Sequence, residues 1–326
     1  MPSPADRLLT TDVGRALAAI RRGGVVAIPT ETVYGLAADA EQPDAVGRIF
    51  AIKGRPSDHP LIVHLAGLDR LEGWAASIPE AAVRLAEACW PGPLTMLLPS
   101  GRRASPLVTG GRATVGIRVP SHPMTLDLLE RHGGGLAAPS ANRFGKVSPT
   151  TARHVLDDLA GLLDPERDVV LDGGPCTVGV ESTIVDLTVD PPQVLRSGAI
   201  SAADIERLLA APTAPASGER RASGMLASHY APDCKVVLAE DAATAGATAA
   251  AHRAQGERVG VLDRTDDPVA AAQLLYTDLR EADRAGLDTL VVVLPAAEGI
   301  GIALRDRLAK AAAPTGNRRA RSNRGG

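Results

Sequence analysis

The sequence predicts an α/β protein with two domains, and three features of the chain support this prediction. Short apolar runs of strand length alternate with amphipathic segments of helix length over most of the 326 residues. Residues 210–224 are rich in Pro, Ala, Ser and Gly and show no periodicity, which indicates a linker. Beyond the linker, strand and helix patterns alternate regularly, as is typical of a small parallel α/β domain.

The composition fits a globular protein and excludes several classes of function. With 45% hydrophobic and 22% charged residues, the chain is long enough for a substantial core. A net charge of −3 gives no global attraction to nucleic acid or anionic membranes, and 2% aromatic residues are too few for a base-stacking platform. Cys89, Cys176 and Cys234 form no C-x-x-C pair, so we expect buried thiols and neither a zinc site nor a disulfide framework.

The sequence also predicts a compartment. Its apolar runs all fall short of the roughly 18–20 residues that cross a bilayer. The first residues, Met1-Pro2-Ser3-Pro4, lack the charged-then-apolar pattern of a secretory signal. We therefore expect the protein in a reducing cytoplasm, away from membranes.

The N-terminal half alternates between the two patterns. Thr10 or Thr11 is expected to cap a first helix that ends near Arg22, before two glycines. Another helix is expected to start at Pro149. The further helices are expected over residues 43–52, 80–89, 124–132 and 201–209, and the strands over residues 25–28, 61–65, 94–98, 114–120, 136–142, 169–171, 181–186 and 193–198.

One loop stands out because it carries two cations. Lys53-Gly54-Arg55-Pro56 reads as an extended segment, since glycine and proline both disfavour a helix interior. Residues i and i+2 of an extended segment share a face, so Lys53 and Arg55 can point at one anion such as a polyphosphate. Taken alone, this pattern favours a solvated basic turn. The other motifs of the sequence favour an anion-binding loop instead.

Further polar residues sit at or beside expected strand ends. The segment 29–36 reads equally well as the edge of a site or as a capped polar turn. Arg118 lies among apolar neighbours and needs a partner or a ligand, whereas His64 in the middle of a strand is more often a packing residue. The full set is rich in cations and hydroxyls and predicts a ligand that bears phosphate; it comprises Thr32, Lys53, Arg55, His64, Thr114, Arg118, Ser140, Asn142, Lys146, Ser148, Ser182 and Arg196.

The C-terminal part shows a simpler pattern. Strands are expected over 236–238, 258–262 and 290–294, and helices run up to residue 254, over 268–285 and over 302–313. Gly299-Ile300-Gly301 precedes the last helix but lacks the third glycine of a dinucleotide fingerprint, because Leu304 stands there. We interpret it as a helix-start turn, with nucleotide binding as the lesser alternative. The short polar tail with Arg318, Arg319, Arg321 and Arg324 is expected to be disordered.

Several motifs, taken together, identify a family. They run in one order over roughly residues 10–210, and the combination is far more specific than any single motif. The motifs are residues 29–36 (PTETVYGL), 53–56 (KGRP) with Pro60-Leu61, 90–95 (WPGPLT), 116–120 (GIRVP), 138–142 (APSAN) and 181–186 (ESTIVD). With these motifs the chain resembles the YrdC-like threonylcarbamoyl-AMP synthases, and the linker with His229-Tyr230-Ala231-Pro232 and the following domain resemble the long, two-domain form.

The resemblance implies a fold and a division into domains. The expected fold is a YrdC-like twisted open sheet around a concave cavity, followed by a small Rossmann-like parallel α/β domain. The implied domains are a catalytic domain at 1–210, a linker or lid at 211–234, a Rossmann-like domain at 235–313 and a basic tail at 314–326. Tyr230 and the linker are expected to cover the cavity as a lid.

The resemblance also implies a reaction and a set of site residues. The family joins L-threonine, bicarbonate and ATP into L-threonylcarbamoyl-AMP and pyrophosphate, a nucleotidyl transfer that serves the modification of tRNA beside the anticodon. By resemblance, Lys53 and Arg55 would be catalytic. L-Threonine would be held by Thr32, His64, Arg118, Ala138 and Ser182, and ATP by Arg55, His59, Thr114, Ser140, Asn142, Ser148, Arg196 and Tyr230.

The expected metal ion and the expected partner enzyme follow from the family resemblance alone. Mg²⁺ is expected to accompany ATP, without assigned protein ligands, and the product is expected to pass to a tRNA threonylcarbamoyl transferase, so that tRNA is an indirect partner. His59 departs from the family pattern, which often has asparagine there.

Three alternatives remain. Carbamoyl-transfer enzymes of hydrogenase maturation use a similar domain, but they also carry zinc-finger cysteine pairs that this sequence lacks. A non-catalytic RNA-binding module is the second alternative, although the net charge and scarce aromatic residues argue against it. Third, the C-terminal domain could serve only to stabilise the first.

Overall fold

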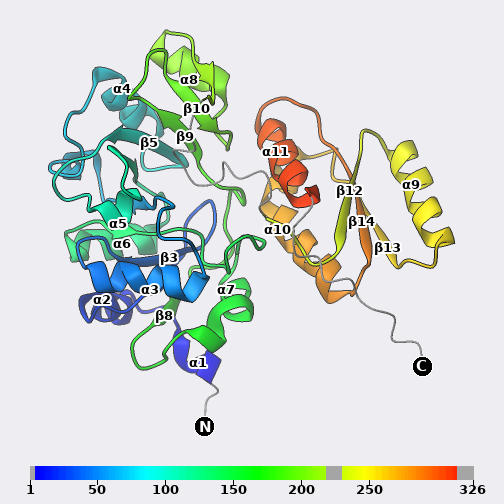
Figure 1. Cartoon of the computed structure of the whole chain (residues 1–326), viewed down its shortest axis with the longest axis horizontal. Helices are drawn as coiled ribbons and strands as arrows, with labels where there is room; N and C mark the ends of the chain where they lie inside the picture. Colours follow the sequence, from blue (N-terminus) through cyan, green and yellow to red (C-terminus); the bar gives the residue numbers. More distant parts are fainter. Residues whose placement is uncertain (1–3, 218–229, 314–326) are drawn as a thin grey trace.

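The computed structural model describes residues 4–217 and 230–313. Within these ranges the chain forms two sheets, and Figure 1 shows the larger, N-terminal sheet beside the smaller, C-terminal one. His229 and the tail after Ala313, both singled out in the sequence, lie outside the described residues. No helix in the described ranges is both long and apolar enough to cross a membrane.

The larger sheet is mixed, with strand order β1-β8-β2-β3-β7-β4-β6-β5-β9-β10-β11. Its strands β2, β7 and β8 are buried along their whole length, which explains why they are continuous apolar runs without alternation. Its strands are β1 (Leu9–Thr10), β2 (Val26–Ile28), β3 (Gly35–Asp39), β4 (Ile62–His64), β5 (Leu94–Pro99), β6 (Thr114–Arg118), β7 (Leu136–Ala137), β8 (Val169–Leu171), β9 (Thr183–Asp186), β10 (Gln193–Arg196) and β11 (Ala214–Pro215).

The smaller sheet confirms the expected parallel arrangement. Its three strands run parallel in the order β12-β14-β13, with the last strand in sequence at the centre. Leu290 to Val293 of the central strand are buried, as a strand covered on both faces requires. The strands are β12 (Lys235–Ala239), β13 (Val259–Leu262) and β14 (Thr289–Val293).

Helices cover both sheets. In Figure 1, α10 and α11 lie on the side of the smaller sheet that faces the larger one, and α9 covers its other face. The α-helices are α1 (Pro4–Leu8), α2 (Val13–Arg21), α3 (Pro43–Lys53), α4 (Glu80–Cys89), α5 (Pro106–Thr109), α6 (Pro123–His132), α7 (Ala152–Leu159), α8 (Ala202–Leu209), α9 (Ala242–Ala254), α10 (Pro268–Arg284) and α11 (Ile300–Ala312), with 3₁₀ turns at Leu68–Arg70 and Ala160–Leu162.

Two predicted helix starts were wrong by a few residues. Helix α2 is capped by Asp12, whose carboxylate accepts from the Gly14 amide, while Thr10 belongs to β1 and only accepts from the Asp12 amide. Helix α7 begins after Thr151, whose hydroxyl accepts from the His154 amide, and not at Pro149. In both cases the side chain best placed to accept an orphan amide sets the boundary.

The predicted extended loop at Lys53 was also wrong. Lys53 is the last residue of α3, and Gly54 ends the helix in the left-handed conformation with φ of 62°. Glycine adopts this conformation without steric cost, so the helix continues one residue further than the loop pattern suggests. A helix end, rather than an extended segment, therefore presents Lys53 and Arg55.

Part of the expected linker has regular structure. Ala214–Pro215 forms β11, which pairs in parallel with β10 at Gln193 and Val194. A two-residue strand at the sheet edge with a proline carries no periodic signal, which is why the sequence did not reveal it. In contrast, the helix-start reading of the Gly299 turn is confirmed: Gly299 has φ of 50° and caps α11, and a Cβ on Gly301 would lie 2.0 Å from the Ala296 carbonyl oxygen.

The two sheets share one apolar cluster. Val33, Val147 and Val180 from the N-terminal part pack with Tyr276 and Leu304 of α10 and α11. Ion pairs add to this contact, with Arg280 of α10 at 2.7 Å from Asp158 of α7. All three cysteines are free thiols; Cys176 and Cys234 are buried as expected, whereas Cys89 is only half-buried.

Candidate active site

A cavity opens where strands of the larger sheet end, and it has about 690 Å³ of empty space including its open mouth. Strands β4 and β6 run parallel with His64 opposite Arg118, so both side chains reach the same sheet edge. The segments after β2, α3 and β7 complete the wall. Eleven of the residues expected to act in catalysis or to bind L-threonine or ATP line this cavity: Thr32, Lys53, Arg55, His64, Arg118, Ala138, Ser140, Asn142, Ser182, Arg196 and Tyr230.

Three expected ATP residues are not part of the cavity wall. His59 is half-buried and meets the edge of the Phe144 ring at 5.4 Å between centroids, so it lies behind a wall residue. Thr114 is half-buried at the first position of β6, opposite Pro99. Ser148 is fully buried and donates to Glu181 at 2.7 Å. These positions place His59 and Ser148 one side chain away from the cavity.

Lys53 is buried in the wall and bound to backbone. Its ammonium donates to the carbonyl oxygens of Ser140 and Asn142, each at 2.5 Å. Burial, with Arg55 close by, holds the pKa of Lys53 well below its ordinary value. Lys53 thus ties the end of α3 to the segment after β7 and sets the shape of the cavity floor. Arg55 lies beside it, with its guanidinium 5.8 Å from the centre of the Phe144 ring.

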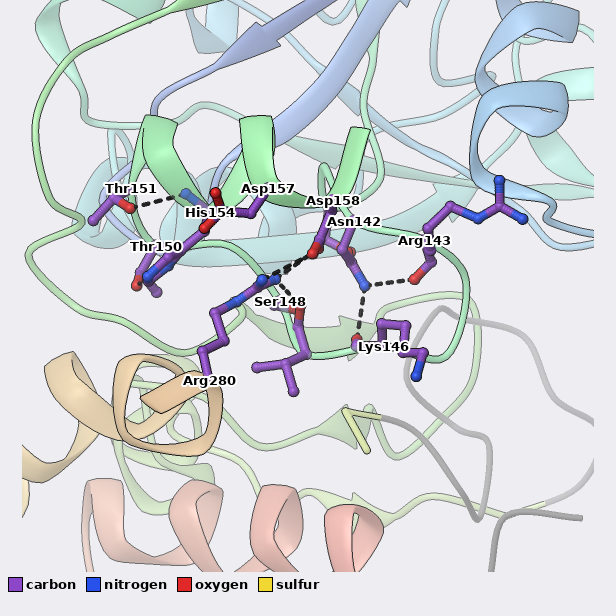
Figure 2. Close-up of polar contacts among 12 residues, drawn as sticks. Asn142, Arg143, Lys146, Ser148, Thr150, Thr151, His154, Asp157, Asp158 and Arg280 are labelled. Carbon is purple, nitrogen blue, oxygen red and sulfur yellow. Dashed lines mark hydrogen bonds and ion pairs between the residues drawn. The ribbon is translucent and has the colours of Figure 1, made fainter. Parts of the chain in front are cut away.

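Asn142 stabilises the loop that follows this contact. Its side-chain amide donates to the carbonyl oxygens of Arg143 at 2.8 Å and Lys146 at 2.7 Å (Figure 2). The Asn142 side-chain oxygen is buried and has no hydrogen-bond partner among the described residues. Buried polar atoms usually have a partner, so this oxygen is an exception in the cavity wall.

Arg118 also lines the cavity, where it contacts three other residues. Its guanidinium donates to the Thr32 hydroxyl at 2.8 Å and to the Gly92 carbonyl at 3.2 Å, and it lies 2.7 Å from a Glu31 carboxylate oxygen. Arg118 and Glu31 form a buried ion pair. Of the five N–H donors of an arginine, these contacts leave at least two for a ligand carboxylate.

His64 lies next to Arg118 and is neutral. Burial and the nearby Arg118 charge lower its pKa to about 3. Its Nδ1 has no hydrogen-bond partner among the described residues. A neutral imidazole can therefore offer one nitrogen to a ligand in the cavity.

Ser182 and Arg196 form a third side of the cavity. The Arg196 guanidinium donates to the Ser182 carbonyl and hydroxyl oxygens, both at 2.9 Å. The Ser182 hydroxyl also lies 2.8 Å from that of Thr95. The antiparallel strands β9 and β10 bring these two residues together, as the expected strand pair requires.

The sequence reasoning missed four charged or phenolic groups at the site. Glu31 and Glu181 stand inside the quoted motifs, and their burial beside apolar strands could have marked them as paired carboxylates. Arg307 and Tyr276 come from the C-terminal helices and both contact Glu181. No local pattern marks these two, because the contact exists only once α10 and α11 pack on the larger sheet.

The charges define what the cavity can do. Lys53, Arg55 and Arg196 can neutralise the phosphates of a nucleotide, while Arg118 with Thr32 and His64 suits a small carboxylate with polar groups. Among the described residues, no group of three or more His, Cys, Asp or Glu could hold a metal ion. The arrangement is one for positioning anionic ligands side by side.

Comparisons with known proteins agree with this geometry. A family model described as telomere recombination matches residues 18–198, and one described as the C-terminal domain of threonylcarbamoyl-AMP synthase matches residues 200–313. The chain is 39% identical to the threonylcarbamoyl-AMP synthase of Pyrococcus abyssi, covering 90% of this chain and 91% of the relative. It is 40% identical to the Bacillus subtilis enzyme of that name, over 94% and 95% of the two chains.

A solved structure gives the same result. The crystal structure of Pyrococcus abyssi Sua5 complexed with L-threonine has a TM-score of 0.87 and 38% identity, covering 92% of this chain and 94% of the other. The expected fold, a YrdC-like sheet followed by a second α/β domain, is thereby confirmed. With both family models and two full-length relatives in agreement, this chain belongs to the threonylcarbamoyl-AMP synthase family.

Proposed function

We propose that this chain catalyses the ATP-dependent joining of L-threonine and bicarbonate into L-threonylcarbamoyl-AMP, with release of pyrophosphate. The observation that carries the proposal is the convergence of a cationic wall and a carboxylate-binding corner in one cavity. Membership of the family and a relative solved with L-threonine support the choice of substrates. The product would serve the threonylcarbamoyl modification of tRNA.

We assign L-threonine to the corner formed by Arg118, Thr32 and His64, with Ser182 and the Ala138 backbone nearby. The remaining Arg118 donors suit the substrate carboxylate, and the neutral His64 and the Thr32 hydroxyl suit its polar groups. Because Glu31 balances the Arg118 charge, the corner favours a ligand that brings both a carboxylate and a donor.

We assign ATP to the wall that carries Arg55, Ser140, Asn142, Arg196 and Tyr230. These residues line the cavity beside the proposed threonine corner, so the two substrates would share one space. His59, Ser148 and Thr114 would act only through neighbours, since none of them lines the cavity. Residues 211–234 are proposed to act as linker and lid between a catalytic domain and a C-terminal domain.

The proposed chemistry is a nucleotidyl transfer. The threonine amine and bicarbonate give a carbamate and water; a carbamate oxygen then attacks the α-phosphorus, and the bond to the pyrophosphate leaving group breaks. Lys53 and Arg55 would neutralise the charge that develops on the phosphates. Their burial strengthens this effect, because the field is less screened than in water.

Mg²⁺ is proposed to arrive with ATP rather than to reside in the protein. Glu181, a carboxylate that lines the cavity, is already bound by Arg307, Tyr276 and Ser148. Mg²⁺ dehydrates reluctantly and is often held through substrate phosphates and water, which fits this wall. Since the product would be used on tRNA, we place the reaction in the cytoplasm, with a tRNA threonylcarbamoyl transferase as the next enzyme.

The test is pyrophosphate release by the purified protein with ATP and Mg²⁺, with L-threonine and bicarbonate each omitted in turn. Release that requires both substrates supports the proposal. Release that does not depend on threonine would point to another acceptor, and folded protein without release would exclude the synthase activity.

A further inference from the structure

Arg307 of α11 is a buried arginine that reaches the cavity wall from the C-terminal domain. It is 1% exposed, which is unusual for arginine and requires paired donors. Its Nε donates to Glu181 at 2.8 Å, and one terminal nitrogen donates to the Ser197 carbonyl at 2.9 Å. Its guanidinium carbon lies 5.4 Å from the centre of the Tyr230 ring.

Glu181, which lines the cavity, is held from several sides. One carboxylate oxygen accepts from Ser148 at 2.7 Å, and the other accepts from Tyr276 at 2.7 Å and from Arg307 at 2.8 Å. Burial disfavours its ionised form, but Arg307 and then Arg196 outweigh burial and lower the pKa of Glu181 to about 2. Glu181 is therefore a fixed negative charge beside a cationic wall.

Arg307 differs from the residues that attach the two parts of the chain to each other. Arg280 of α10 binds Asp158 at 2.7 Å (Figure 2) and also the Val147 carbonyl, and Arg284 pairs with Asp157. None of these groups lines the cavity. Both Glu181 and Tyr230, the side chains that Arg307 contacts across the interface, do line it.

We propose that Arg307 is a positioning residue for ATP: together with Tyr276 it fixes the Glu181 carboxylate and supports the Tyr230 ring, so that the C-terminal domain completes the nucleotide side of the cavity. This inference rests on the proposed synthase function. On this proposal, the C-terminal domain does more than stabilise the first domain, because the charge of its Arg307 acts directly at the nucleotide site.

The physical reason is the charge that would remain without Arg307. Glu181 would face the cavity with Arg196 as its nearest remaining cation, and Arg196 is already bound to Ser182. An under-neutralised carboxylate repels a triphosphate, and an unsupported Tyr230 ring loses its defined position. Among the described residues, no hydrogen bond or ion pair joins Arg118 to Arg307, so the threonine corner should keep its own geometry.

The first experiment compares Arg307→Met with Arg305→Met, measuring product formation with each substrate varied in turn. Arg305 lies on the same helix but binds Glu240 and the Pro295 carbonyl, away from the cavity. We expect Arg307→Met to raise the KM for ATP by about tenfold or more and to leave the KM for threonine within about twofold. Arg305→Met should match the wild type.

The second experiment varies pH, because a purely structural role would not respond to it. The groups that face Glu181 are Arg307 from α11, Tyr276 from α10, Arg196 from β10, and Tyr230 and Ser148. In Arg307→Met the pKa of Glu181 should rise, so that acidification protonates it and removes the repulsion. The ratio of the variant's KM for ATP to the wild-type value should then fall as the pH is lowered.

A double variant guards against simple unfolding. Arg307→Met with Glu181→Gln removes both buried charges together and should recover part of the lost ATP affinity, with a melting temperature above that of Arg307→Met. Equal effects of Arg307→Met on both substrates, with no pH response and no recovery in the double variant, would overturn the inference. Inactive wild-type protein would instead overturn the proposed function, so the two failures are distinguishable.

Discussion

Each of the two sheets has a cavity at the ends of its strands. The two cavities differ in the side chains that line them. At the larger sheet, cations and hydroxyls line the space. At the carboxyl ends of β13 and β14, the hollow is lined mainly by Leu262, Leu275, Val292 and other apolar side chains. Its two charged residues, Arg264 and Asp278, pair with each other at 2.5 Å.

The difference shows that position in an α/β fold does not by itself make a nucleotide site. The smaller domain has parallel strands and a glycine turn before its last helix, yet backbone geometry accounts for both glycines of that turn. At the larger sheet, cations and hydroxyls line one shared cavity. Function therefore follows the side chains that meet in a hollow, and the predictions below test that statement.

The largest expected effect is at Lys53. Lys53→Ala removes a buried cation and leaves the Ser140 and Asn142 carbonyls without their donor, so product formation should fall by about 100-fold or more. The measurement is the rate of pyrophosphate release under saturating substrates. Lys235→Ala, at an exposed position of β12, is the matched control and should behave as wild type. If Lys53→Ala kept its activity, Lys53 would not be needed to neutralise the phosphate charge during the reaction.

The next effect is at the threonine corner. Arg118→Met leaves Glu31 as a buried carboxylate without its partner, and the KM for threonine should rise by about 10- to 100-fold. Adding Glu31→Gln should restore stability without restoring threonine use, which separates folding from binding. Recovery of threonine use in the double variant would show that Arg118 only neutralises Glu31.

A third prediction concerns stability and pH, because the larger hollow contains a buried neutral histidine. The pKa of His64 is about 3 when folded and near 6.5 when unfolded, so the unfolded chain binds more protons between these values. The free energy of unfolding should therefore decrease as pH falls below about 6.5, with His154, whose pKa burial lowers to about 4, contributing in the same direction.

Chemical denaturation of wild type and His64→Gln across this range measures the effect. The variant should lose stability less steeply than wild type between pH 6.5 and 4. Above pH 7.5 the two curves should run parallel, since His64 is then neutral in both states. Identical slopes below pH 6.5 would contradict the neutral burial of His64.

The smallest effect is expected at the second hollow. Leu262→Ala shortens a side chain that is only half-buried, so it should lower stability modestly, and Arg264→Gln removes a partly exposed ion pair worth at most about 1 kcal/mol. Neither change should alter the KM for ATP or threonine. A rise in either KM would show that the second hollow takes part in the reaction.

Much of this architecture could be predicted from the sequence. The apolar run at 25–28, the alternation after Lys235 and the helical segment at 201–209 mark strands and helices correctly because local chemistry dictates them. The residues that gather around the cavity could be listed because they stand in motifs, and motif residues from distant segments meet where strands end.

The remaining features depend on packing that no local pattern contains. The sequence pattern predicts Lys53 in a loop, yet Lys53 is the last residue of α3, and Gly54 ends the helix in the left-handed conformation. Arg307 lies 126 positions from Glu181, and in sequence it resembles any charged residue of an amphipathic helix. Only the docking of α10 and α11 reveals that it is buried.

The most direct test is a crystal structure of this protein with L-threonine and a non-hydrolysable ATP analogue. The account predicts density for both ligands in the larger cavity, with the threonine carboxylate at Arg118 and the phosphates near Lys53, Arg55 and Arg196. The apolar hollow of the smaller sheet should stay empty. Nucleotide bound at the smaller sheet, or threonine away from Arg118, would contradict it.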